Sequence, residues 1–154
     1  MAMTMAGEVT LPADRARVWA ALNDPEVLKR CIPGCQDLGK ASDAEFQATV
    51  KAVVGPVRAT FKGKVLLSDI DAPNGYKISG EGQGGVAGFA KGGATVRLAD
   101  AEGGTRMSYD VEATVGGKLA QLGGRLINGV ARKYADEFFA NFAKALTQDV
   151  PTAR

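Results

Sequence analysis

The chain has 154 residues, a formal net charge of +2, two cysteines and no histidine. Its length fits a single domain with a real hydrophobic core, and the nearly balanced charge argues against a nucleic-acid partner. The lack of histidine excludes Ser-His-Asp and Cys-His catalysis and imidazole metal ligands. No apolar run is long enough to span a membrane, and the N-terminus lacks the features of a signal peptide. We therefore expect a cytoplasmic protein.

The first segment is predicted to hold one strand and two short helices. Apolar and polar residues alternate over residues 3–11, which is typical of a strand. Asp14 is placed to cap a first helix. Asp24 followed by Pro25 predicts the start of a second helix that runs to Lys29.

The middle of the chain is predicted to form an antiparallel meander. Period-two alternation, interrupted by turns rich in Gly, Pro and Asn, predicts strands at residues 45–54, 58–69, 75–83, 89–99 and 104–115. The connections are too short for crossover helices, so consecutive strands pair with each other.

One long amphipathic helix is predicted at about residues 118–148. Its apolar stripe is Leu119, Leu122, Leu126, Val130, Tyr134, Phe138, Phe142 and Leu146. The expected fold class is α+β: a curved antiparallel sheet of about seven strands around the C-terminal helix, with two short helices after the first strand. We expect a single domain over residues 1–150 and a tail over 151–154.

The alternate positions of these strands that are expected to face the core, which we call the inward phase, carry little side-chain volume. Its small members are Ala48, Ala52, Ala59, Gly63, Gly80, Gly82, Ala90, Gly92, Ala94 and Ala113. Such a face must either let a helix approach closely or leave a cavity. An empty cavity of ~300 Å³ would cost roughly 7 kcal/mol, which is close to the whole stability of a typical domain. The predicted helix is also thin in its first half, so we expect a space there that holds an apolar molecule.

Two apparent motifs do not carry their usual chemistry. Residues 80–85 match G-x-G-x-x-G, but a strand rather than a helix follows, so a dinucleotide site is not expected. Cys31 and Cys35 provide at best half of a zinc site without histidine. We interpret them as small buried hydrophobes, with a redox pair or an intermolecular metal ligand as the alternatives.

The glycine-rich turn at residues 84–93 has one large side chain, Phe89. Either Phe89 tucks into the core and the turn is only flexible, or the turn is a gate over the cavity or a finger that touches a membrane or a partner. Residues 32–34 are a candidate for the opposite lip of the cavity.

Charged and hydroxyl groups leave further alternatives open. Lys118, Arg125 and Arg132 recur every seven residues and would share one helix face, either solvated or docked on an acidic protein or anionic lipid. Tyr76 and Tyr109 fall in the inward phase. There they either complete the core or act in the cavity as hydrogen-bond donors or as a general acid.

Several stretches together resemble the family of the carbon monoxide dehydrogenase G-subunit, within the START-related, polyketide-cyclase-like (SRPBCC) superfamily. They are residues 7–9 with 18–22, 22–28, the Cys-Ile-Pro-Gly-Cys segment 31–35, 55–58 with 61–63, and 116–123. The resemblance implies a helix-grip fold around an apolar cavity. It also implies an accessory role beside a molybdenum hydroxylase such as carbon monoxide dehydrogenase, in membrane recruitment or in handling a lipid-like electron acceptor. Relatives often carry a C-terminal hydrophobic anchor, and this sequence reaches Arg154 without one.

We therefore expect a non-enzymatic carrier of a hydrophobic, lipid-like ligand, such as an isoprenoid quinone, without a tightly bound cofactor or metal. The alternatives are a cyclase or dehydratase that uses the tyrosines, and an assembly factor that docks an acidic partner. Peripheral contact with the inner face of the cell membrane is part of the expectation, through Lys118, Arg125 and Arg132. The expected ligand-binding residues are Phe61, Val65, Tyr76, Ile78, Phe89, Val96, Met107, Tyr109, Leu119, Leu122, Leu126 and Ile127.

Overall fold

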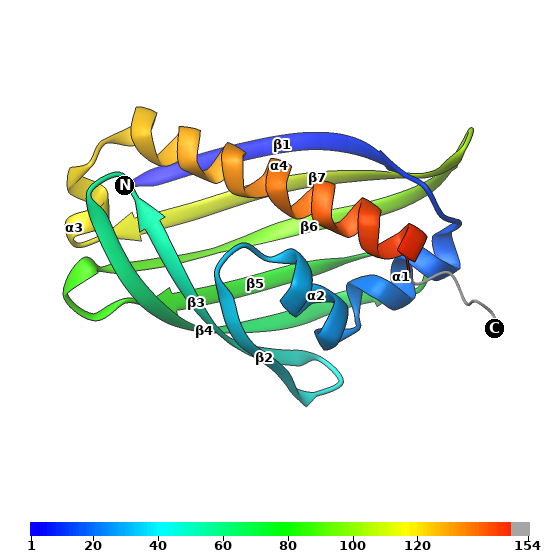
Figure 1. Cartoon of the computed structure of the whole chain (residues 1–154), viewed down its shortest axis with the longest axis horizontal. Helices are drawn as coiled ribbons and strands as arrows, with labels where there is room; N and C mark the ends of the chain where they lie inside the picture. The colour runs from blue at the N-terminus through cyan, green and yellow to red at the C-terminus, as the bar shows by residue number, and fades with distance from the viewer. Residues whose placement is uncertain (149–154) are drawn as a thin grey trace.

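A seven-stranded antiparallel sheet curves around a long C-terminal helix in the computed structural model, which describes residues 1–148 (Figure 1). The strands are β1 (Ala2–Leu11), β2 (Cys35–Ser42), β3 (Glu45–Val54), β4 (Val57–Asp71), β5 (Gly75–Gln83), β6 (Phe89–Ala101) and β7 (Gly104–Gly116). Their order in the sheet is β1-β7-β6-β5-β4-β3-β2. The helices are α1 (Arg15–Leu22), α2 (Pro25–Cys31), α3 (Lys118–Gln121) and α4 (Gly124–Gln148), with a 3₁₀ turn η1 at Gly85–Ala87. The expected helix-grip architecture is confirmed.

Both predicted helix starts are confirmed by their caps. The Asp14 carboxylate accepts a hydrogen bond from the backbone N–H of Arg17 at 2.9 Å, and Asp24 accepts one from the N–H of Glu26 at 3.0 Å. These bonds satisfy N–H groups that have no partner within the helix. Helix α2 continues to Cys31, two residues beyond the predicted end at Lys29.

Strand β2 is the one strand that the alternation did not locate. It lies at the edge of the sheet, and only Cys35 and Leu38 along it are half-buried, while its other residues are exposed. Its register with β3 also shifts between Cys35 and Asp37 and again between Lys40 and Ser42. A bulged edge strand with little buried surface leaves no period-two signal in the sequence.

The prediction of one continuous helix over residues 118–148 is wrong. Gly123 has a φ of +89°, a left-handed conformation that side chains rarely adopt, and it separates the short α3 from α4. The predicted apolar stripe is not one buried face either. Residues four apart advance about 40° around a helix at each step, so a stripe of that spacing winds across the surface. Phe142 is fully buried, whereas Leu126 is 37% exposed.

The sheet and helices enclose two hydrophobic clusters instead of one. The larger is built on α1, α2 and the last turns of α4, with Leu11, Val18, Cys31, Phe142 and Leu146 among its most buried members. The smaller contains Val115, Leu119 and Ile127 and packs against Met1, Met3, Val54, Val57, Phe61, Ala90 and Leu122. The second cluster fills the region where the sequence predicted free space, beside the start of the C-terminal helix.

No helix within residues 1–148 has the length and apolar character needed to cross a bilayer. The predicted domain end at residue 150 and the predicted tail over 151–154 lie outside the described residues.

Candidate functional site

An open apolar cavity of about 430 Å³ lies on the concave face of the sheet. This volume falls within the range of about 300–1,000 Å³ that is usual for small-molecule sites. The apolar side chains that border it are Ile32, Ala48, Val50, Phe61, Val65, Ile78, Ala90, Ala94, Val111 and Ala113. Gly63, Gly80, Gly82, Gly92 and Gly93 complete its floor. The cavity thus spans β3 to β7, and no described residue of α3 or α4 borders it.

Small residues create this space because adjacent strands place them side by side. Val65 pairs with Gly80 and Gly63 with Gly82, while Ile78 pairs with Ala94 across β5 and β6. At these positions the sheet presents backbone or a single methyl group where a Leu or Phe would otherwise fill the concave side. The small-residue pattern therefore predicted a real cavity, although it lies farther from the C-terminal helix than expected.

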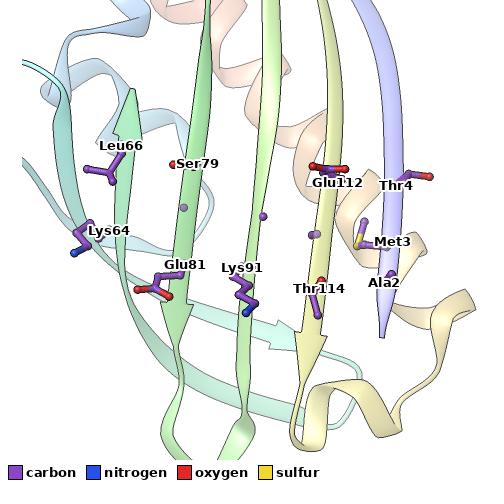
Figure 2. Close-up of a pocket in the computed structure, with 13 residues that line it drawn as sticks. Ala2, Met3, Thr4, Lys64, Leu66, Ser79, Glu81, Lys91, Glu112 and Thr114 are labelled. Atoms are coloured by element: carbon purple, nitrogen blue, oxygen red, sulfur yellow. The ribbon is translucent and has the colours of Figure 1, made fainter. Parts of the chain in front are cut away.

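Charged residues near the cavity belong to the opposite face. Lys64, Glu81, Lys91 and Glu112 alternate with inward residues along their strands, and Figure 2 shows their side chains in a depression on the outer face. That outer depression measures about 710 Å³. It shares seven lining residues with the concave cavity, namely these four charged residues, Gly80, Gly92 and Ala113. Its charged, solvent-facing lining suits water better than an apolar ligand, so we take the concave cavity as the candidate site.

Of the predicted ligand-binding residues, Phe61, Val65 and Ile78 border the cavity. Three others, Tyr76, Val96 and Met107, are buried in the larger hydrophobic cluster. The predicted residues at the start of the C-terminal helix, Leu119, Leu122 and Ile127, belong to the smaller cluster. Packing between the sheet and the helix uses these side chains, so none of the six borders the cavity.

Phe89 and Leu126 lie outside the cavity as well. Phe89 pairs with Gln83 and Gly116 and has the parity of Lys91, which places it on the outer face. Its ring covers Gly116, where an added Cβ would lie 2.2 Å from Phe89 Cε1. The expectation that Phe89 enters the core or the cavity is therefore wrong. Leu126 contacts the turn at Gly55 and is partly exposed.

Neither Tyr76 nor Tyr109 borders the cavity. Tyr76 packs against Trp19 with ring centroids 5.1 Å apart, and burial raises its pKa to about 12. Tyr109 stacks on Phe139, and its hydroxyl accepts a 3.4 Å hydrogen bond from Arg132. A phenol with a pKa near 12 is a poor proton donor at neutral pH.

The cysteines have different environments. Cys31 is 1% exposed and belongs to the larger cluster, which agrees with its interpretation as a small hydrophobe. Cys35 is half-buried, and burial raises the pKa of its thiol. A raised pKa lowers the fraction of reactive thiolate. Within residues 1–148, no group of three Asp, Glu, Cys or His side chains is arranged to hold a metal ion.

Residues around Ile32 form one side of the cavity, as the sequence suggested. Ile32 borders the space directly, and the Gly34 carbonyl accepts a hydrogen bond from the Lys51 N–H at 2.9 Å. Val50 and Val111 also border the cavity without having been singled out. Both fall in the inward phase of their strands and lie next to small inward residues, Ala48 for Val50 and Ala113 for Val111.

The three basic residues expected on one helix face are divided between two helices. Lys118 begins α3, while Arg125 and Arg132 lie on α4 beyond the break. Arg132 also donates to the Ala6 carbonyl at 3.4 Å, so it contacts the edge of β1. Lys118 and Arg125 remain exposed at one end of the molecule.

Solved structures with the same fold cover almost the whole chain. A conserved protein from Geobacillus kaustophilus is 28% identical with a TM-score of 0.88, covering 95% of this chain and 96% of that one. An uncharacterised protein from Rhizobium leguminosarum is 19% identical with a TM-score of 0.76, covering 97% of each chain. The ZhuI aromatase/cyclase from Streptomyces sp. R1128 is 12% identical with a TM-score of 0.69, covering 99% and 98%.

No curated protein matches the chain significantly. The family model for the G-subunit of carbon monoxide dehydrogenase (CoxG) matches residues 7–147, which include both helices that precede β2, the whole cavity lining and nearly all of α4. The chain belongs to this carbon monoxide dehydrogenase G-subunit (CoxG) family.

Proposed function

We propose that this protein is a non-catalytic carrier of an apolar, lipid-like molecule that serves a carbon monoxide dehydrogenase or a related molybdenum hydroxylase. The observation that carries the proposal is the concave cavity, whose inward side chains are all aliphatic, aromatic or absent. Membership in the CoxG family supports an accessory role beside such an oxidoreductase.

The lining favours a hydrocarbon chain over a polar substrate. Each CH₂ group buried there contributes about 0.8 kcal/mol, so a few isoprene units are enough for firm binding. A polar substrate would lose its hydrogen bonds to water and find few replacements among these side chains. An isoprenoid quinone combines such a tail with a redox-active ring, which suits delivery of an electron acceptor.

An enzymatic role of the cyclase type has less support. Among residues 1–148, the cavity lining includes no tyrosine, and the Tyr76 hydroxyl is held in its neutral form by burial. The likeness to an aromatase/cyclase, at 12% identity, concerns the fold alone.

Solvent extraction of natively purified protein followed by mass spectrometry tests the carrier proposal. We expect an apolar compound at a stoichiometric level, and saturable binding of an added isoprenoid quinone after the protein has been stripped. Extracts free of such compounds, together with no binding of added quinone, would contradict it. Loaded protein should also support quinone reduction by carbon monoxide dehydrogenase faster than the stripped protein does.

A further inference from the structure

Strand β1 forms one edge of the sheet and, within residues 1–148, pairs only with β7 (Figure 1). At its start the Val115 N–H donates to the Met1 carbonyl at 2.7 Å, and the Met1 amino group donates to the Val115 carbonyl at 2.8 Å. Opposite residues in an antiparallel ladder alternate between bonded and non-bonded pairs, so the odd residues of β1 bond to β7. The even residues therefore direct their N–H and C=O groups away from the sheet: Ala2, Thr4, Ala6, Glu8 and Thr10.

These five even residues, which we call the edge row, are all exposed. Among the described residues, the polar contact at the backbone of the edge row comes from Arg132, which donates to the Ala6 carbonyl at 3.4 Å. This contact agrees with the alternation, because it shows that the Ala6 carbonyl faces away from β7. A row of open N–H and C=O groups is a template for a further strand.

Strand β1 also lacks the features that protect most edge strands, which are bulges, lysines and prolines. It pairs with β7 over ten residues without a register shift, and it contains no Lys, Arg or Pro. The other edge strand, β2, has two register shifts and carries Asp37 and Lys40. Glu8 is the one charged residue of β1, and it forms an ion pair with Arg106 of β7 at 3.6 Å. Of the two edges, β1 is therefore the one open to pairing.

The sequence of β1 is complementary to itself in the antiparallel direction. Pairing of two copies about a two-fold axis at Ala6 places Ala6 opposite Ala6, Thr4 opposite Glu8, and Ala2 opposite Thr10. Each of these pairs belongs to the edge row on both sides, so the two strands would exchange about ten backbone hydrogen bonds. No like charges meet, and the Thr4 hydroxyl can donate to the Glu8 carboxylate of the second copy.

The side chains on the concave side match in the same register. Met5 lies opposite Gly7 of the second copy, and Met3 lies opposite Val9. The Met3, Met5 and Val9 side chains are half-buried in one copy, so pairing would bury more of their apolar surface. Gly7 leaves no room for a side chain of its own because the Tyr109 hydroxyl covers it. The flexible Met5 side chain of the second copy can pack beside that ring.

We propose that β1 pairs with β1 of a second copy, so that two sheets join into one continuous antiparallel sheet. The contact uses the same surface on both copies and therefore closes as a dimer, whereas pairing of β1 with β2 would give an open chain. The two-fold axis runs perpendicular to the sheet, so both cavities lie on the same concave side of the dimer. No described residue of β1 borders the cavity, and the pairing is therefore independent of ligand binding.

Sedimentation velocity over a range of protein concentrations tests the dimer. We expect the wild-type chain to have twice the mass of one copy at high micromolar concentration and to dissociate on dilution. Ala6→Pro removes an N–H of the edge row and leaves the bonds to β7 intact, so it should weaken association about tenfold or more. Ala6→Thr keeps this N–H and should associate like the wild type. A wild-type chain that stays monomeric, or a folded Ala6→Pro variant that associates fully, would overturn the proposal.

Oxidative cross-linking tests the register without use of a proline variant. In a Cys35→Ser background, Ala6→Cys would place the two introduced residues about 5.5 Å apart between Cα atoms, which suits a disulfide. Thr10→Cys is the matched control, because it lies in the same edge row but its two copies would be more than about 20 Å apart. We expect a disulfide-linked dimer from Ala6→Cys alone. Equal cross-linking of both variants, or of neither, would contradict the proposed pairing.

The charge at residue 4 provides a second test of the register. Thr4→Glu places a carboxylate opposite Glu8 of the second copy, whereas Thr4→Lys places an ammonium group there. We expect the first variant to weaken association and the second to strengthen it, by roughly threefold in each direction. Identical effects of the two variants would contradict the pairing of residues 4 and 8. Quinone binding by Ala6→Pro should equal that of the wild type, which separates failure of the dimer from failure of the carrier function.

Discussion

Gly7 and Tyr109 face each other across the β1–β7 ladder so closely that no side chain fits at residue 7. A Cβ added there would lie 2.3 Å from the Tyr109 hydroxyl oxygen and 2.5 Å from Cζ. The tyrosine ring is held in this place by its stack on Phe139 and by the hydrogen bond from Arg132. The glycine therefore lets β7 hold a large ring against α4 at the edge of the sheet.

We predict that Gly7→Ala lowers the free energy of unfolding by about 1–3 kcal/mol, because Tyr109 must leave its contacts. Urea denaturation measures the change. Gly39→Ala on β2 is the control, since nothing lies within 4 Å of a Cβ added there, and its effect should stay within about 0.5 kcal/mol. Addition of Tyr109→Ala to Gly7→Ala should cost less than the sum of the single changes.

The cavity should be closed by a side chain at Gly82 without damage to the fold. A Cβ there would lie 3.9 Å from Phe61 Cβ and 4.0 Å from the Lys62 carbonyl oxygen, which are ordinary contacts. We predict that Gly82→Leu reduces quinone binding at least tenfold while the free energy of unfolding stays the same or rises. Gly39→Leu, also in a strand but outside the cavity, should bind quinone like the wild type. Full binding by Gly82→Leu would exclude the concave cavity as the site.

Stability at high pH should depend on Tyr76. Burial raises the pKa of this phenol from 10.0 to about 12, so the unfolded chain loses the proton at a lower pH than the folded one. Between those values the unfolded state binds fewer protons, and the free energy of unfolding therefore falls as the pH rises. By about pH 12 the raised pKa of Tyr76 should have lowered the free energy of unfolding by roughly 2–3 kcal/mol.

Comparison with Tyr76→Phe isolates this contribution, because lysines and other tyrosines titrate equally in both proteins. We predict that the difference in unfolding free energy between the two proteins is constant from pH 7 to 9. Above pH 10 it should shift in favour of the variant. Parallel stability curves up to pH 12 would show that Tyr76 is not shielded from water as its burial indicates.

Phe142 and Leu126, two members of the apolar stripe on the C-terminal helix, should contribute very differently to the free energy of unfolding. Phe142 is 0% exposed and stacks on Phe138 at a centroid distance of 5.4 Å. We predict that Phe142→Ala costs about 3–5 kcal/mol, whereas Leu126→Ala costs about 1 kcal/mol or less. Thermal and urea unfolding of the two variants provide the measurement. Equal losses would mean that the stripe behaves as one buried face after all.

Most of the fold was predictable because its signals are local. Alternation located six strands, and the caps Asp14 and Asp24 marked both short helices, since a carboxylate beside a free helix N–H is a contact between near neighbours in sequence. Strand β2 escaped because an edge strand buries little and so carries no pattern. The break at Gly123 escaped because the apolar spacing continues across it.

The sequence by itself determined that the concave face would carry little side-chain volume. Glycine and alanine contribute at most one methyl group at each inward position, whichever strands pair with each other. Only the tertiary structure decided where the resulting space lies. Leu119 of α3 and Ile127 near the start of α4 pack with Val115 of β7 and fill the region where the sequence predicted free space. The cavity remains between the two hydrophobic clusters. Which inward side chains meet a helix and which stay open depends on how far α4 reaches across the sheet. That reach is set by contacts distant in sequence, such as the one between Tyr134 and the Val53 N–H at 3.2 Å, which no local pattern contains.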